Sequence, residues 1–148
     1  MTTKAKATPR FKVGLEAKPL RAVKKAISDG LDVYNTAAAG VKPGESEFVL
    51  GARNRNGRLL GGFYVVIYFK TAFLKWAWVD DKDRRGGVGR QLMEAAEAEA
   101  RLRGARIMYL DTFSFQARPF YEKLGYSVFG TLKLGEDGLE RYWMSKPL

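Results

Sequence analysis

Residues 80–90 constrain this chain more than any other stretch, and they read Asp-Asp-Lys-Asp-Arg-Arg-Gly-Gly-Val-Gly-Arg. An apolar, aromatic run ends directly before them, at residues 76–79, and a helical pattern of apolar residues begins directly after them. The order strand, glycine-rich turn, helix is therefore predicted. Glycine lets the backbone approach a ligand closely, and the first N–H groups of a helix have no partner within it. The turn is therefore predicted to bind phosphate or pyrophosphate.

Arginines around the turn add positive charge and forked donors that suit phosphate, at Arg84, Arg85 and Arg90. Three interpretations compete. The first is an ordinary turn with solvated arginines. The second is the dinucleotide pattern G-x-G-x-x-G, but Leu92 replaces its third glycine and the chain is short for that fold. The third is the spacing R-x-x-G-x-G, which ends at Gly89.

Two residue types are missing from the chain, which has no cysteine and no histidine among its 148 residues. Disulfides, thiolate metal sites and cysteine nucleophiles are therefore excluded. The usual general base and the serine–histidine–aspartate triad are excluded as well, and no metal site is expected. Catalysis would have to use carboxylates, tyrosines, backbone groups, water or a cofactor.

The formal net charge of +10 favours polyanionic partners. The positive residues are spread along the chain, so a soluble surface with one cofactor-binding patch is favoured over a dedicated nucleic-acid surface. No apolar run approaches the roughly 18 residues of a membrane span. Residues 1–10 are polar and basic, unlike a secretory signal, and are expected to be a mobile tail before a single domain over residues 11–148. A cytoplasmic location is expected.

Hydrophobic periodicity and turn residues predict an alternation of seven strands and three helices. Strands are predicted over residues 11–17, 47–53, 58–70, 71–79, 106–112, 126–134 and 139–145. Helices are predicted from Pro19 to just before Gly40, over residues 88–103 and over residues 116–124. The early strands are antiparallel, and a right-handed strand–helix–strand crossover supplies a parallel pair. The fold class is therefore mixed α/β, with a mainly antiparallel sheet.

The side chains within these elements are also assigned to faces. The helix over residues 88–103 is expected to bury one side, formed by Val88, Leu92, Ala96 and Ala100. Glu97 and Arg101, four residues apart, are expected as an exposed pair on its outer side. The three tryptophans are expected in the core, at Trp76, Trp78 and Trp143.

This order of elements resembles the fold of the GNAT N-acetyltransferases over nearly the whole chain. Arg84-x-x-Gly87-x-Gly89 is similar to the loop with which that family binds the pyrophosphate of coenzyme A. Residues 112–126 read TFSFQARPFYEKLGY and resemble the family's strand and short helix with the ending F-Y-x-x-x-G-[FY]. Both motifs lie on the expected elements, so the chain is identified as a member of this family.

The resemblance implies acetyl-CoA as donor, with coenzyme A as product, and a primary amine on a small molecule or a lysine side chain as acceptor. It implies a sheet of about seven strands with helices on both faces. The strands over residues 71–79 and 106–112 would splay apart for the pantetheine arm, and the pyrophosphate would lie on the amides of residues 85–90. The cofactor-binding residues are then expected to be Val79, Arg84, Arg85, Gly86, Gly87, Val88, Gly89, Arg90, Ser114 and Ala117.

The resemblance assigns Tyr121 as the general acid for the leaving thiolate, whereas spacing alone would make it an aromatic residue of an amphipathic helix. The strand over residues 71–79 lacks the glutamate with which many relatives take the amine's proton. Asp80, Asp111, water or a backbone carbonyl remain as candidates. Ser114 stands where the family often has asparagine. The acceptor is assigned to Tyr34, Asp111 and Glu136, which are weaker candidates.

Two other functions remain open from the sequence. The net charge motivates an acetyltransferase that acts on an RNA-bound acceptor such as an aminoacyl-tRNA. The missing glutamate motivates a non-catalytic module that binds coenzyme A or a partner protein. A homodimer also remains open, nucleic acid is not favoured as a partner, and no membrane association is expected.

Overall fold

A computed structural model describes residues 10–148. The chain divides into two compact units, Met1–Val41 and Lys42–Leu148, and each is described by itself. The first contains helix α1 (Leu20–Ala39), which ends at Gly40. Gly40 has a left-handed φ of 70°, and its N–H donates to the carbonyl of Thr36 at 3.0 Å. Glycine adopts this conformation without steric cost, so the helix predicted between Pro19 and Gly40 is confirmed.

The strand predicted over residues 11–17 was wrong, because these residues form neither helix nor strand. Their alternating apolar side chains are fully or largely exposed, at Phe11, Val13 and Leu15. Alternation describes only where side chains point, whereas a strand also needs backbone pairing with a neighbour. The sheet therefore has six strands rather than about seven. Within the described residues, no helix is both long and apolar enough to cross a membrane.

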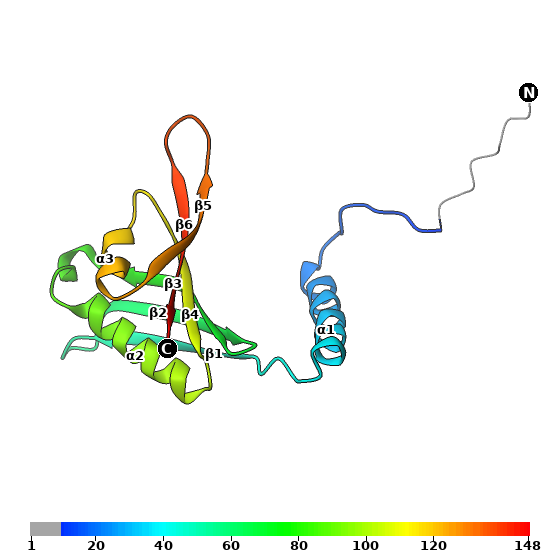
Figure 1. Cartoon of the computed structure of the whole chain (residues 1–148), viewed down its shortest axis with the longest axis horizontal. Helices are drawn as coiled ribbons and strands as arrows, with labels where there is room; N and C mark the ends of the chain where they lie inside the picture. The colour runs from blue at the N-terminus through cyan, green and yellow to red at the C-terminus, as the bar shows by residue number, and fades with distance from the viewer. Residues whose placement is uncertain (1–9) are drawn as a thin grey trace, which may run out of the picture. The chain divides into compact units, whose positions relative to one another are not determined.

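The second unit is a mixed sheet in the order β1-β2-β3-β4-β6-β5 (Figure 1). Its strands are β1 (Ser46–Arg53), β2 (Leu59–Tyr68), β3 (Thr71–Val79), β4 (Ile107–Phe113), β5 (Ser127–Lys133) and β6 (Glu140–Pro147). A short 3-10 turn η1 (Asp81–Asp83) leads to α2 (Val88–Leu102), and α3 (Arg118–Lys123) follows β4. Only β3 and β4 pair in parallel, with α2 as their crossover, so the predicted mixed sheet is confirmed.

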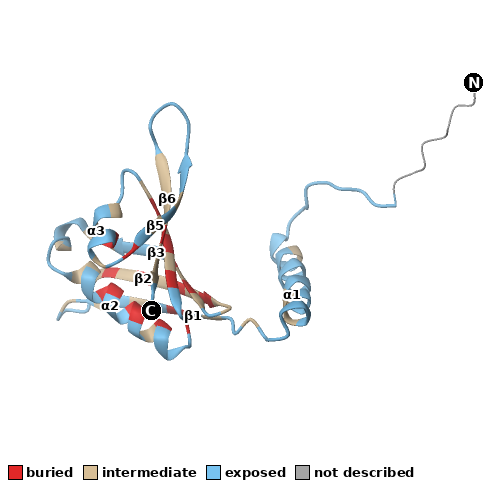
Figure 2. Ribbon diagram, in the orientation of Figure 1, coloured by how far each residue is buried: buried red, intermediate tan, exposed pale blue. Residues whose placement is uncertain are grey.

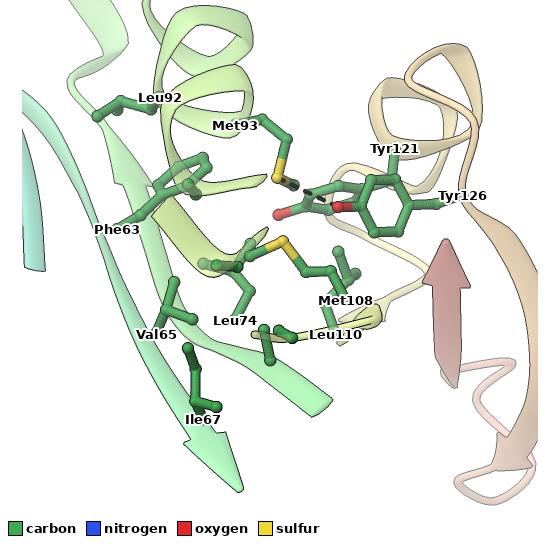
Figure 3. Close-up of a cluster of buried hydrophobic side chains, with 14 of the residues drawn as sticks. Phe63, Val65, Ile67, Leu74, Leu92, Met93, Met108, Leu110, Tyr121 and Tyr126 are labelled. Atoms are coloured by element: carbon green, nitrogen blue, oxygen red, sulfur yellow. Dashed lines mark hydrogen bonds between the residues drawn. The ribbon is translucent and has the colours of Figure 1, made fainter. Parts of the chain in front are cut away.

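One face of this sheet carries the core, and α2 and α3 both contribute to it (Figures 2 and 3). Alternate residues of β2 point into it, at Phe63, Val65 and Ile67. The buried side of α2 matches the prediction at Leu92, Ala96 and Ala100, and Met93 joins it. Burying each large aliphatic side chain contributes roughly 1.5–3 kcal/mol, so this layer supplies much of the stability of the unit.

The prediction that the three tryptophans lie in the core was wrong. Trp143 is half-buried and does not belong to the core cluster. Trp76 and Trp78 are 67% and 50% exposed. The cause is a bulge in β3: Val65 pairs with Leu74, whereas Tyr64 pairs with Trp76, which leaves Lys75 as an extra residue. Strict alternation would place both tryptophans on the buried side with Leu74. One extra residue reverses this alternation and places them on the opposite face.

Glu97 was predicted to form an exposed pair with Arg101. The pair forms, at 3.7 Å, but Glu97 is only 6% exposed. Its carboxylate accepts two hydrogen bonds of 3.0 Å from Lys146 Nζ and one of 3.0 Å from the Tyr126 hydroxyl. Burial, together with this carboxylate, raises the pKa of Tyr126 well above its usual range. These contacts tie α2 to β6 and to Tyr126, which lies between α3 and β5. The partner on β6 is 49 positions away, so helical periodicity could not reveal it.

Lys146→Met should lower the free energy of unfolding by about 2–4 kcal/mol, because it removes two hydrogen bonds from the buried Glu97 carboxylate and leaves it the longer, 3.7 Å ion pair with Arg101. The lower part of this range is expected, since the Lys146 side chain is 26% exposed. Urea unfolding at neutral pH measures the change. Lys133→Met at an exposed position of β5 is the matched control and should change little. Equal midpoints for the two variants would contradict a stabilising role for the ion pair.

Candidate active site

The parallel ladder between β3 and β4 stops halfway. Residues 71–74 of β3 pair with residues 107–110 of β4, and no pairing between the two strands follows. β3 nevertheless continues along β2 until Val79 pairs with Gly61, and β4 continues along β6 until Phe113 pairs with Arg141. The sheet therefore opens into a wedge between residues 75–79 and 111–113. The bulge at Lys75 lies where the wedge begins and increases the local twist.

The glycine-rich loop connects the end of β3 to α2 (Figure 1). Gly87 has a left-handed φ of 84° and directly precedes α2, and no side chain among the described residues caps this helix end. Arg85 has a left-handed φ of 67° although it is not glycine. Such a residue costs roughly 1–2 kcal/mol, and strain of this kind concentrates at functional sites. The uncapped N–H groups and the helix dipole suit an anion.

The three arginines of this loop have different surroundings. Arg84 pairs with Asp81 at 2.9 Å, and its Nε donates to the carbonyl of Val79 at 3.3 Å. Arg90 pairs with Glu94 at 3.1 Å. The described part of the chain contains no ion pair to Arg85. Arg85 is thus the guanidinium most readily offered to phosphate, while Arg84 braces the loop.

Gly89 lies where α2, α3 and the end of β3 meet. A Cβ atom at this position would lie 3.2 Å from Phe120 Cζ and 3.7 Å from Val79 Cγ2. The first distance is tighter than ordinary van der Waals contact, so a larger residue would require the Phe120 ring or the first turn of α2 to shift. Glycine therefore allows the loop and the short helix to approach one another.

Tyr121 lies on α3 and belongs to the core that α2 covers (Figure 3). It is 8% exposed, and its ring lies 5.1 Å from Phe120 and 6.1 Å from Tyr126 between centroids. Burial raises the pKa of Tyr121 to about 12, and the negative charge of Asp111 adds to this rise. The phenol therefore stays protonated at neutral pH and can donate a proton.

The segment between β4 and α3 is held by side-chain hydrogen bonds. The Phe113 amide donates to Gln116 Oε1 at 2.8 Å, and the Ala117 amide donates to Thr112 Oγ1 at 3.4 Å. The Ser114 amide donates to the Glu140 carbonyl at 2.8 Å, and Ser114 Oγ accepts the Glu140 amide at 3.1 Å. The Ser114 hydroxyl proton is left for another acceptor. Ser114 and Ala117 thus lie between the end of β4 and Tyr121.

Asp111 lies on β4 where the wedge opens. It accepts a 2.8 Å hydrogen bond from Arg141 Nε, and its side chain is 15% exposed. The Arg141 guanidinium also lies 5.3 Å and 4.8 Å from the ring centroids of Phe113 and Trp143. The carboxylate is therefore held in place beside the opening, and its charge acts on Tyr121.

Two weaker candidates, Glu136 and Tyr34, make no described contact with these residues. Glu136 lies in the exposed turn between β5 and β6. Tyr34 lies on α1 in the first unit and is 69% exposed. Their assignment to the acceptor stays a prediction. Asp80, a candidate base, is already engaged, because its carboxylate pairs with Arg58 at 3.0 Å and accepts the Lys82 amide at 3.2 Å.

Arg58 is the residue near the loop that sequence reasoning missed. The chain offered one indirect signal, the turn at residues 54–57 that ends directly before it. Nothing in the linear sequence connects that turn to Asp80, which lies 22 positions away.

A sheet that opens beside a glycine-rich helix N-terminus, with a protonated phenol nearby, suits a coenzyme-A-dependent acyltransferase. Residues 21–126 match the family model described as the acetyltransferase (GNAT) family, which covers most of the chain. The chain belongs to this family, as its two motifs predicted. It is therefore an acetyl-CoA-dependent acyltransferase.

Individual relatives agree with this assignment. Acetyltransferase Atu2258 from Agrobacterium fabrum is 30% identical over 122 residues, which cover 82% of this chain and 88% of the relative. Blasticidin-S acetyltransferase from Streptomyces morookaense is 29% identical over 119 residues, or 80% and 77% of the two chains. The crystal structure of an acetyltransferase from Bacillus cereus has a TM-score of 0.80 and 30% identity, and covers 93% of this chain and 98% of that one.

Gly89→Val should weaken coenzyme A binding by about tenfold or more, since overpacking costs roughly 1–3 kcal/mol and would displace the first turn of α2. Isothermal titration calorimetry with coenzyme A measures the dissociation constant. Ala98→Val, at an exposed position of the same helix, is the matched control. Affinity equal to wild type in the Gly89 variant would place the cofactor elsewhere.

Proposed function

We propose that this chain transfers the acetyl group of acetyl-CoA directly to a primary amine within a ternary complex, at the wedge between β3 and β4. The single observation that carries the proposal is the buried, protonated phenol of Tyr121, which packs close to the residues that meet at Gly89. The glycine-rich loop would hold the pyrophosphate on the amides of residues 85–90, with Arg85 as its first cationic contact. Val79, Ser114 and Ala117 would line the pantetheine arm.

In the proposed reaction the amine nitrogen attacks the thioester carbon and forms a tetrahedral intermediate. The carbon–sulfur bond then breaks, and the leaving thiolate takes a proton from the hydroxyl of Tyr121. Because the pKa of Tyr121 is about 12, its proton is present throughout the neutral range. The phenolate that forms beside a thiol is restored from solvent or from the proton released by the amine.

The acceptor arrives as an ammonium ion and must lose a proton before it attacks. β3 offers no carboxylate for this step, and the two candidate carboxylates are both ion-paired, Asp80 with Arg58 at 3.0 Å and Asp111 with Arg141 at 2.8 Å. Asp111 is the carboxylate whose charge acts on Tyr121, so we assign it to attract the ammonium group and to accept its proton through water. A carboxylate at this position also favours a cationic substrate over an anionic one.

The acceptor is proposed to be a small molecule in preference to a lysine side chain. The support is the relative that is described as an acetyltransferase of blasticidin S. An RNA-bound acceptor has the net charge of the chain as its only support. The homodimer and the cytoplasmic location expected from the sequence stay predictions.

A thiol-release assay tests the proposed function. The protein is mixed with acetyl-CoA and a panel of primary amines, and free coenzyme A is measured with a thiol-reactive dye. The background is low because the protein has no cysteine. Amine-dependent thiol release, with an acetylated amine detected by mass spectrometry, is expected for a cationic small molecule. Acetylation of RNA-bound amines alone would favour the second candidate.

Tyr121→Phe should lower kcat by about 10²–10⁴-fold and leave the dissociation constant of acetyl-CoA within about twofold, because only the proton donor is lost. Turnover with the best amine and calorimetry with acetyl-CoA measure the two quantities. Tyr109→Phe on β4 removes a half-buried hydroxyl on the opposite face and serves as the matched control. Equal turnover of wild type and the Tyr121 variant would exclude the general acid.

The pH dependence gives this prediction a second readout. The folded pKa of Tyr121, about 12, lies above the usual value of 10.0, so its contribution to stability is present below pH 10 and is lost as the pH rises toward 12. Wild-type kcat should show no loss of the general acid between pH 7 and pH 10. Tyr121→Phe should lose less stability than wild type over the alkaline range. A fall in wild-type kcat near pH 8 that disappears in the variant would contradict the raised pKa.

A further inference from the structure

Three carboxylates stand directly before the proposed pyrophosphate loop, at Asp80, Asp81 and Asp83. Carboxylates repel a nearby pyrophosphate, so their charges have to be balanced if the loop is to bind one. Asp81 pairs with Arg84 at 2.9 Å. Asp80 and Asp83 both pair with Arg58, each at 3.0 Å. One guanidinium from outside the loop therefore pairs with two of the three acids and offsets one of their two negative charges.

The turn between β1 and β2 fixes the position of Arg58. The side chain of Asn54 accepts the amide of Asn56 at 3.0 Å and the amide of Arg58 at 2.9 Å. Gly57 has a left-handed φ of 81°, and its amide donates to the carbonyl of Asn54 at 2.9 Å. Arg53 Nη1 donates to the carbonyl of Gly57 at 2.8 Å. The turn is thus a hydrogen-bonded unit that presents Arg58 in one direction.

The backbone then brings this turn to η1. The Asp80 amide donates to the Leu60 carbonyl at 2.8 Å, which continues the β2–β3 pairing to the last residue before η1. A Cβ atom at Gly61 would lie 2.7 Å from the Trp78 carbonyl oxygen, so only glycine permits this approach of the two strands. Arg58 lies directly before β2, Asp80 lies directly before η1, and Asp83 is the last residue of η1. The ion pairs therefore join two segments that the sheet already places together.

We propose that Arg58 is a positioning residue for coenzyme A. Its guanidinium bridges Asp80 and Asp83 and offsets part of their negative charge, so that the loop meets the pyrophosphate with less carboxylate repulsion. The inference rests on the proposed placement of the pyrophosphate on this loop. Arg58 acts through the two aspartates and is not assigned a contact with the cofactor.

The exposure of Arg58, Asp80 and Asp83 predicts whether the loss of Arg58 changes folding stability or cofactor affinity. The side chain of Arg58 is 48% exposed, and those of Asp80 and Asp83 are 28% and 22% exposed. Ion pairs this exposed contribute little to folding stability. The repulsion that they prevent acts only when the anionic cofactor is bound. Loss of Arg58 should therefore change affinity more than it changes the unfolding midpoint.

The first test replaces Arg58 by methionine in the full chain and measures coenzyme A binding by calorimetry. We expect a dissociation constant about tenfold higher than wild type at low salt, and a smaller ratio at high salt because salt screens the repulsion. Arg58→Lys should recover part of the affinity, since a single ammonium group pairs with both carboxylates less well. Arg55→Met is the matched control, because it removes the same charge from the same turn at a position where the described residues show no ion pair. Its dissociation constant for coenzyme A should equal that of wild type.

The second test is a charge rescue. Adding Asp80→Asn and Asp83→Asn to Arg58→Met removes the uncompensated carboxylates, and an asparagine at position 80 can still accept the Lys82 amide. We expect the triple variant to bind coenzyme A within about threefold of wild type. A purely structural clamp predicts the reverse, because the triple variant has lost all of its ionic contacts.

The outcomes separate this inference from the proposed function. If Gly89→Val weakens coenzyme A binding but Arg58→Met does not, the proposed role of Arg58 is wrong and the proposed cofactor site is unaffected. The same conclusion follows if the triple variant does not recover affinity. If Arg58→Met weakens binding no more than Arg55→Met, the effect is one of general charge and the positioning role is wrong. If wild type binds coenzyme A and Gly89→Val binds it equally well, the loop is not the pyrophosphate site and both proposals fall.

Discussion

The interrupted ladder between β3 and β4 is the constraint on which the rest of the second unit depends. Two parallel strands that pair for only four positions give up backbone hydrogen bonds that a continuous sheet would make. The opening is tolerated because each strand keeps a full antiparallel partner on its other side, β2 for β3 and β6 for β4. The wedge is therefore a stable gap between two intact halves of a sheet, and its free backbone groups are available to a ligand.

Contacts on the core face of the sheet hold the residues around the wedge in place. α2 has two roles in this arrangement: its first turn is the proposed anion site, and its middle carries Glu97 into contact with Lys146 and Tyr126. The Tyr126 amide also donates to the Tyr121 carbonyl at 3.1 Å. A buried ionic contact, a short helix and the proposed proton donor are thereby connected, which explains how a six-residue helix can hold a phenol in place.

Short-range patterns in the sequence predicted the elements that neighbouring residues determine. Gly87 and Gly89 marked the loop and the start of α2, and the motif around Tyr121 marked α3. The errors arose where a partner distant in sequence decides the outcome. Glu97 looked exposed because Lys146 was not visible to a helical repeat, and the tryptophans looked buried because strict alternation ignores a bulge. Residues 11–17 alternate like a strand, but a strand also requires a neighbour, which no periodicity supplies.

The bulge at Lys75 decides which face of the sheet each later residue of β3 occupies, and the candidate active site depends on that choice. After the bulge, Ala77 and Val79 pair with Phe63 and Gly61, which both lie on the core side of β2. Removing one residue there would exchange the two faces of the end of β3 rather than shorten it slightly. The tryptophans would then turn inward, and the residue that enters the glycine-rich loop would leave the strand on the wrong side. We therefore expect this strand to tolerate a change of one residue in length less well than the turns do.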